Sequence, residues 1–140
     1  MSAETWAVDT SVAVPLLVDI EGLNQRLEEW LAGRPLCLTT HSLAETYAVL
    51  TRLHGDARMA PADAVRAIDG RFGAPAALPP ETAAQVHRLL AARGISGGAV
   101  YDALVALAAA ARGVPLASRD ARAVKTYEAL GARVEVLADT

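Results

Sequence analysis

Two aspartates stand at, or just past, the ends of short apolar runs that are typical of buried strands. Asp9 follows residues 6–8, and Asp120 follows residues 114–117 in the segment VPLASRD. The carboxyl ends of parallel strands meet at one edge of a sheet, where open α/β folds bind their ligands. Carboxylates gathered there favour hard divalent cations such as Mg²⁺ or Mn²⁺. The two aspartates therefore predict a metal site.

Two further acids occur near the starts of expected helices. Asp102 is the only charged residue in GGAVYDALVALAAAA, a segment apolar enough to form a buried helix. A carboxylate is seldom buried unless it is paired or bound to a metal. Glu45 lies in THSLAETYAVL, early in an amphipathic segment. Asp9, Glu45, Asp102 and Asp120 are therefore candidates for one acidic site.

Each acid also has a purely structural explanation. Asp9 and Asp120 are good helix N-caps, and Asp102 would complement a helix dipole. The stretch from Ser42 to Glu45 matches the capping box S-x-x-E, which would turn Glu45 back onto the start of its own helix. Acids favour helix starts in general, so spacing alone leaves both explanations open.

The elements that must position these acids alternate between strands and helices. Strands are expected at residues 6–8, 35–39, 114–117 and 133–137, and helices at 11–18, 21–32, 42–54, 61–71, 81–93, 99–112 and 121–130. Residues 73–80 are expected to be a loop or to hold one short strand. This alternation predicts a single α/β domain over residues 1–140, with a central, mostly parallel sheet of four to five strands and helices on both faces.

Composition points to a folded intracellular chain. The 140 residues are 53% hydrophobic, which is enough to bury a core and argues against disorder. Cys37 is the only cysteine, so an internal disulfide and a thiolate metal cluster are excluded. The longest uncharged apolar run, residues 103–111, is far shorter than the roughly 20 residues of a membrane span. The first residues show no basic signal-peptide region, so we expect a cytoplasmic protein with no membrane contact.

The net charge of −3 is unevenly distributed. Residues 1–44 hold two arginines against six acids, whereas residues 45–125 hold ten basic residues against seven acids. Twelve of the thirteen basic residues are arginine, whose planar fork suits phosphate. A GC-rich genome would produce the same arginine bias. Arg119, beside Asp120, is the first candidate for binding a substrate phosphate.

The order of these motifs resembles the PIN domain, and in particular the VapC-type toxin ribonucleases of bacterial toxin–antitoxin pairs. VDTS, a glutamate in the helix after the second strand, YDALVALAAA and PLASRD follow one another over nearly the whole chain. The resemblance implies an acidic site formed by Asp9, Glu45, Asp102 and Asp120. In that site we expect Asp9, Asp102 and Asp120 to ligate the metal, and Glu45 to ligate it through water or to orient the nucleophile. The two supporting hydroxyls, which would hold the carboxylates or metal waters, are those of Ser11 and Ser118.

The resemblance also implies a function. The implied function is that of an Mg²⁺- or Mn²⁺-dependent endoribonuclease toxin that cleaves structured cellular RNA by metal-assisted hydrolysis. The implied products carry a 5′-phosphate and a 3′-hydroxyl. The implied partners are a second copy of the chain and a VapB-like antitoxin whose tail covers the acidic site. Some relatives carry a further acid shortly after the last aspartate. Here Ala121, Ala123 and Val124 follow, so the number of metal ions stays open.

Two other functions compete with this interpretation. A non-catalytic PIN-type module could bind RNA or protein with the same fold. A receiver-like phospho-acceptor domain also gathers acids at a sheet edge, but it needs a lysine after a late strand, and Lys125 lies within an expected helix. The histidines at 41, 54 and 87 have no metal-ligand spacing and are interpreted as structural. Tyr101 is expected to line the site or to pack.

Overall fold

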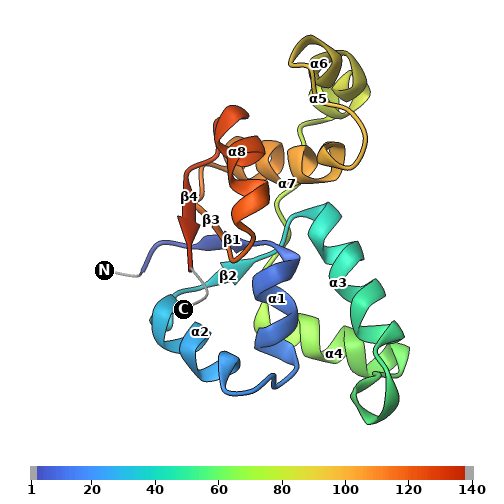
Figure 1. Cartoon of the computed structure of the whole chain (residues 1–140), viewed down its shortest axis with the longest axis vertical. Coiled ribbons are helices and arrows are strands. Elements are labelled where there is room, and N and C mark those ends of the chain that lie inside the picture. The colour runs from blue at the N-terminus through green and yellow to red at the C-terminus, as the bar shows by residue number, and fades with distance from the viewer. Residues whose placement is uncertain (1–2, 138–140) are drawn as a thin grey trace.

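Four short strands form one parallel sheet in the computed structural model, which describes residues 3–137 (Figure 1). The strands are β1 (Trp6–Val8), β2 (Leu36–Cys37), β3 (Leu116–Ser118) and β4 (Val134–Val136), in the order β2-β1-β3-β4. The chain passes from β1 to β2 on one side and later returns to β3 on the other. The boundary between β1 and β3 is therefore the point at which the strand order reverses, the usual ligand position in such sheets.

Eight α-helices and one 3₁₀ turn complete the described chain. They are α1 (Thr10–Leu17), α2 (Leu23–Leu31), α3 (Thr40–Arg52), the turn η1 (Gly55–Ala57), α4 (Pro61–Arg71), α5 (Pro80–Ala84), α6 (Val86–Ala92), α7 (Ala99–Arg112) and α8 (Ala121–Ala129). Helices α1 to α4 lie on one side of the sheet and α7 and α8 on the other, while α5 and α6 project from one end (Figure 1). No helix within residues 3–137 has the length and apolar character needed to cross a membrane.

The two sides of the sheet pack against separate hydrophobic clusters. Val8 belongs to a cluster with Leu27 and Leu50 from the α1–α4 side. Its neighbour Ala7 belongs to a second cluster, with Val105 of α7 and Tyr127 of α8. Successive residues of a strand point to opposite faces, and burial on both faces explains why the strands are continuous apolar runs.

The expected fold class is confirmed, and most elements lie where the sequence places them. Helices α4 and α7 have the predicted bounds, and the sheet has four strands, all parallel. The segment 73–80 is a loop in which Ala76 makes one isolated parallel bridge to Thr39.

The single helix predicted over residues 81–93 is wrong. The chain forms α5 and α6 there, with a break at Gln85, whose φ of −123° and ψ of 13° lie outside the helical range. Helix α5 has no buried residue and α6 buries only Leu90. Core packing therefore does not hold α5 in line with α6.

Candidate active site

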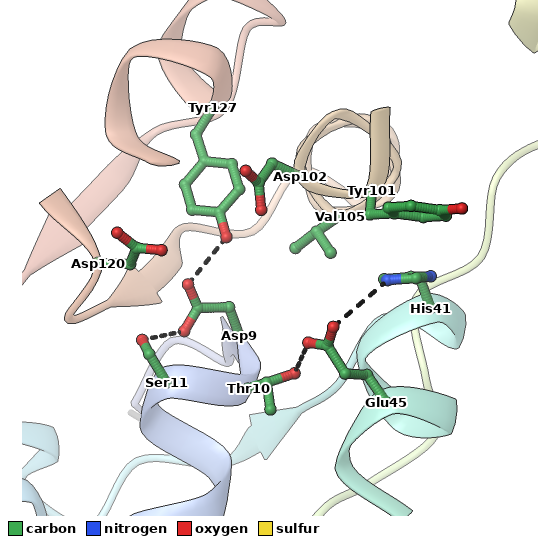
Figure 2. Close-up of a pocket in the computed structure, with 10 residues that line it drawn as sticks. All are labelled: Asp9, Thr10, Ser11, His41, Glu45, Tyr101, Asp102, Val105, Asp120 and Tyr127. Atoms are coloured by element: carbon green, nitrogen blue, oxygen red, sulfur yellow. Dashed lines mark hydrogen bonds and ion pairs between the residues drawn. The ribbon is translucent and has the colours of Figure 1, made fainter. Parts of the chain in front are cut away.

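A polar pocket opens at the carboxyl ends of β1 and β3, between the first turns of α1, α3 and α7 (Figure 2). All four acids predicted from the sequence line it, although they are far apart in the chain. The pocket is lined by Asp9, Thr10, Ser11, His41, Glu45, Tyr101, Asp102, Val105, Asp120 and Tyr127. The structure thus brings the predicted acids into one cavity at the point where the strand order reverses.

Asp9 is the most enclosed of these acids, with 5% of its surface exposed. It directly follows β1, and its carboxylate accepts hydrogen bonds from three hydroxyl groups. Ser11 donates to Oδ1 at 2.5 Å, while Ser118 and Tyr127 donate to Oδ2 at 2.5 and 2.8 Å. These bonds fix the orientation of the carboxylate across the junction of β1, β3 and α8.

Each of the two serines is held so that its proton points at Asp9. The oxygen of Ser11 accepts the backbone N–H of Arg119 at 2.9 Å, and that of Ser118 accepts the backbone N–H of Asp120 at 3.0 Å. A hydroxyl that accepts one bond is free to donate its own proton to another acceptor. The two predicted hydroxyl positions therefore both contact Asp9.

Burial and hydrogen bonding act in opposite directions on Asp9. Burial raises the pKa of Asp9, because a carboxylate loses hydration there, and the bonds from Ser11, Ser118 and Tyr127 lower it. Burial, and then the nearby charge of Asp9, raise the pKa of Tyr127. The Tyr127 phenol therefore remains a neutral donor to Asp9.

Asp102 faces the other acids from the first turn of α7. Burial raises the pKa of Asp102, and the negative charges of Asp120, Asp9 and Glu45 raise it further, while His41 opposes them. This pattern shows that the carboxylates repel one another across the pocket. A bound cation would relieve that repulsion.

Glu45 does not form the capping box that its sequence context suggests. Helix α3 begins one turn earlier, and Thr39 is its N-cap, exchanging bonds with Ser42. Glu45 therefore lies within the helix and points into the pocket, where Oε1 accepts a hydrogen bond from Thr10 and Oε2 lies 3.9 Å from His41 Nε2. The capping-box explanation for Glu45 is wrong.

Asp120 serves both as a cap and as part of the pocket. Its Oδ1 accepts the backbone N–H of Arg122 at 3.0 Å, which caps α8, and its side chain also lines the cavity. The structural and functional explanations of Asp120 are therefore compatible.

Arg119 is not among the residues that line the pocket. Its Nη1 donates to the backbone carbonyl of Ser11 at 3.1 Å. The guanidinium thus lies against the start of α1.

The donor chemistry of the pocket fits Mg²⁺ or Mn²⁺. Its acids supply oxygen donors, and their repulsion is of the kind that a divalent cation neutralises. No three His, Cys, Asp or Glu residues among residues 3–137 form a ready-made metal cluster. Mg²⁺ keeps several waters and takes only one or two carboxylates directly, so it does not require such a cluster.

Four pocket residues were not predicted as part of the acidic site, namely Thr10, His41, Val105 and Tyr127. Tyr127 follows the N-cap Asp120 by seven residues, which places both on one face of α8. His41 precedes Glu45 by four residues on α3, so the two also share a face, and interpreting His41 as only structural missed its place in the pocket. Thr10 follows Asp9 directly. Helical spacing from the predicted acids was the signal that could have found Tyr127 and His41.

Comparison with known proteins agrees with this geometry. The family model described as "PIN domain" matches residues 7–129. The chain is 54% identical to Ribonuclease VapC27 of Mycobacterium tuberculosis over 94% of this chain and 96% of that protein. It is 42% identical to Ribonuclease VapC40 of the same species over 75% of this chain and 79% of that protein.

A solved structure shows the same fold at low sequence identity. It is VapBC2 from Rickettsia felis bound to a DNA fragment from their promoter, with a TM-score of 0.66 and 14% identity over 95% of this chain and 98% of that chain. The family match and the two ribonuclease relatives agree with the motif order of the sequence. This chain therefore belongs to the PIN-domain family and, within it, to the VapC type.

Proposed function

We propose that this chain, as one domain of residues 1–140, is the endoribonuclease toxin of a toxin–antitoxin pair. It hydrolyses phosphodiester bonds of structured cellular RNA with Mg²⁺ or Mn²⁺. The observation that carries the proposal is the convergence of Asp9, Glu45, Asp102 and Asp120 on one pocket. The PIN-domain match and the similarity to two VapC ribonucleases support it.

In this proposal Asp9, Asp102 and Asp120 hold the metal. When bound, Mg²⁺ or Mn²⁺ polarises the scissile phosphate and lowers the pKa of the attacking water. Ser11 and Ser118 keep the Asp9 carboxylate in a fixed orientation and favour its ionised form, which metal binding requires.

Glu45 is assigned the orientation of the attacking water. The hydrogen bond from Thr10 to Oε1 fixes its carboxylate toward the pocket. Its other oxygen, Oε2, lies 3.9 Å from His41 Nε2 and is the atom to which the water would donate a hydrogen bond.

Arg119 is the proposed phosphate contact of the substrate. It is adjacent in sequence to Asp120, and its bond to the Ser11 carbonyl holds the guanidinium against the start of α1, a helix whose first residues line the pocket. Such a contact positions the RNA backbone and carries no sequence information.

The proposed partners are RNA, a VapB-like antitoxin and a second copy of the chain. A structural neighbour was solved as VapBC2, bound to promoter DNA, which supports an antitoxin partner for this chain. The proposed location is the cytoplasm, where the RNA substrates are, and the single buried cysteine fits a reducing compartment.

Cleavage of total cellular RNA by the purified chain, freed of partner proteins, tests this function. We expect discrete fragments with Mg²⁺ or Mn²⁺, none in EDTA, and suppression by the co-expressed antitoxin. A folded, metal-supplied chain that leaves RNA intact would instead indicate a non-catalytic binding module.

A further inference from the structure

An exposed aromatic ring stands at the edge of the acidic pocket. Tyr101, in the first turn of α7, leaves 58% of its surface exposed, the largest fraction among the exposed large hydrophobic residues of the described chain. Three other aromatic rings, those of Trp6, Phe72 and Tyr127, are buried instead. Tyr101 lines the acidic pocket together with its sequence neighbour Asp102, a proposed metal ligand.

The ring of Tyr101 is held in place from the other side of the pocket. The imidazole of His41, in the first turn of α3, stacks on it with ring centroids 5.3 Å apart and planes 15° from parallel (Figure 2). His41 lies one helical turn before Glu45, whose Oε2 is 3.9 Å from its Nε2. Two helices that carry acids of the site thus support one stacked pair of rings.

The stacked rings of Tyr101 and His41 could bind RNA in a way that the acids cannot. Carboxylates repel the phosphates of RNA, and a metal ion attracts only the phosphate that it contacts. Stacking on an aromatic ring needs no charge and tolerates any base, because every base has a flat π-face. A ring that is already fixed by a neighbour also loses little conformational freedom when a base binds.

We propose that Tyr101, backed by His41, is a stacking platform for an unpaired nucleobase next to the scissile phosphate. The inference rests on the proposed ribonuclease function and defines the local form of its substrate. A base inside a duplex has both faces covered by its neighbours, so only an unpaired, unstacked base can cover the Tyr101 ring. The preferred substrate is therefore RNA that is single-stranded at the cleavage site.

Fluorescence of 2-aminopurine tests the platform without depending on catalysis. A short single-stranded RNA carrying this base is titrated with the chain in Ca²⁺, and gels verify that the RNA stays intact. Stacking on Tyr101 quenches the fluorescence. We expect Tyr101→Ala to remove the quenching and weaken binding about tenfold, within the range measured for base–aromatic stacks, while Tyr101→Phe retains both.

Tyr47→Ala is the matched control, because Tyr47 is 36% exposed on α3 and does not line the acidic pocket. It should bind and quench as the wild type does. His41→Ala should lose less binding affinity and less quenching than Tyr101→Ala does. If His41→Ala binds and quenches as the wild type does, the part of the proposal in which His41 supports the Tyr101 ring is overturned. Circular dichroism verifies that each variant is folded.

Two results would overturn the platform. One is equal binding and quenching by the wild type and Tyr101→Ala, which would indicate that the exposed ring contacts a protein partner and not a base. The other is equal affinity for a fully paired RNA duplex.

Cleavage assays separate this inference from the proposed function. If the wild type cleaves RNA, and Tyr101→Ala does so with unchanged KM and kcat, the function stands and the platform fails. Quenching that depends on Tyr101 in a chain without nuclease activity supports the platform and refutes the nuclease. A higher KM with nearly unchanged kcat in Tyr101→Ala supports both, since stacking is binding shared by ground and transition states.

Discussion

At the scale of single residues, the Asp9 carboxylate shows how hydroxyl donors oppose the effect of burial on an acid inside a folded core. Burial raises its pKa, and three hydroxyl donors counter that effect. Two of the donors belong to the motifs VDTS and PLASRD, and the third, Tyr127, comes from the helix that follows. Tyr127 is thus a positioning residue for a proposed metal ligand.

Tyr127→Phe is expected to lower kcat about tenfold, the lower end of the range for partners of metal ligands. Loss of the phenol bond also raises the pKa of Asp9, because that bond lowers it in the native chain. The carboxylate then needs a higher pH to ionise, so the acid limb of the pH–rate profile shifts upward. Tyr47→Phe is the control for an exposed tyrosine, and identical profiles for the two variants would contradict the assignment of Tyr127.

Asp102→Asn is expected to stabilise the metal-free chain while removing activity. Because the pKa of Asp102 is raised, its protonated carboxyl stabilises the folded chain below about pH 4. This contribution is lost as the pH rises through the raised pKa and the carboxyl ionises. The variant should therefore melt about 3 °C higher near neutral pH and show no advantage near pH 4, as differential scanning calorimetry in EDTA would measure. Mg²⁺ should raise the melting temperature of the wild type only. If Asp102 mainly complemented the dipole of α7, the variant would instead be less stable at neutral pH.

The sequence predicts the acids of this site more readily than their partners. Asp9, Asp102 and Asp120 were identifiable because a charge stands out beside an apolar run. Tyr127 and His41 gave no such signal, since an aromatic residue at helical spacing is usually part of the core. Only the closing of β1 against β3 brings Asp9 within 2.8 Å of the Tyr127 hydroxyl.

At the scale of elements, the start of α3 determines where Glu45 points. Thr39 and Ser42 exchange hydrogen bonds at 2.9 and 3.1 Å and are fully buried. This capping box begins the helix at Thr40, one turn before the alternative S-x-x-E box. Thr39 and Ser42 are both of a residue type that favours the N-cap position, and the bridge between Thr39 and Ala76 is a tertiary contact that a local pattern cannot reveal.

Thr39→Ala is expected to lower the free energy of unfolding by about 1–2 kcal/mol, because it removes a buried N-cap. Urea denaturation measures this loss. Thr51→Ala, near the end of the same helix, should change stability by less than about 0.5 kcal/mol, since its hydroxyl bonds only to the carbonyls of preceding residues. Equal losses in the two variants would show that the capping box does not define the start of α3.

Helix α7 was predicted with its bounds, whereas the weakly packed segment 81–93 was not. Helix α7 contributes several fully buried alanines and fills the space beside β3. Residues 81–93 have a similar apolar pattern, but α5 buries nothing and the chain breaks at Gln85. Periodicity predicts a helical tendency, and tertiary packing decides whether the segment forms one continuous helix.

At the scale of the whole molecule, the strand order explains why acids from distant segments meet. In the order β2-β1-β3-β4, the residues after β1 and β3 become neighbours, while α3 and α7 add Glu45 and Asp102 from opposite sides of the sheet (Figure 1). The net charge of −3 works against binding a polyanion. The proposed binding of RNA would therefore have to come from a cation at the acids, from the proposed arginine contact and from the proposed stacking platform.

Cleavage of cellular RNA by a matched set of carboxamide variants tests the central claim most directly. Asp9→Asn, Asp102→Asn and Asp120→Asn each remove a proposed metal ligand, whereas Asp56→Asn alters an exposed aspartate away from the pocket. With Mg²⁺ or Mn²⁺ supplied and folding verified, we expect each of the three pocket variants to cleave at least about a hundredfold more slowly than the wild type. Asp56→Asn should cleave at the wild-type rate and yield the same fragments. Cleavage that survives in all three pocket variants, or that persists in EDTA, would contradict the metal-dependent mechanism at these acids.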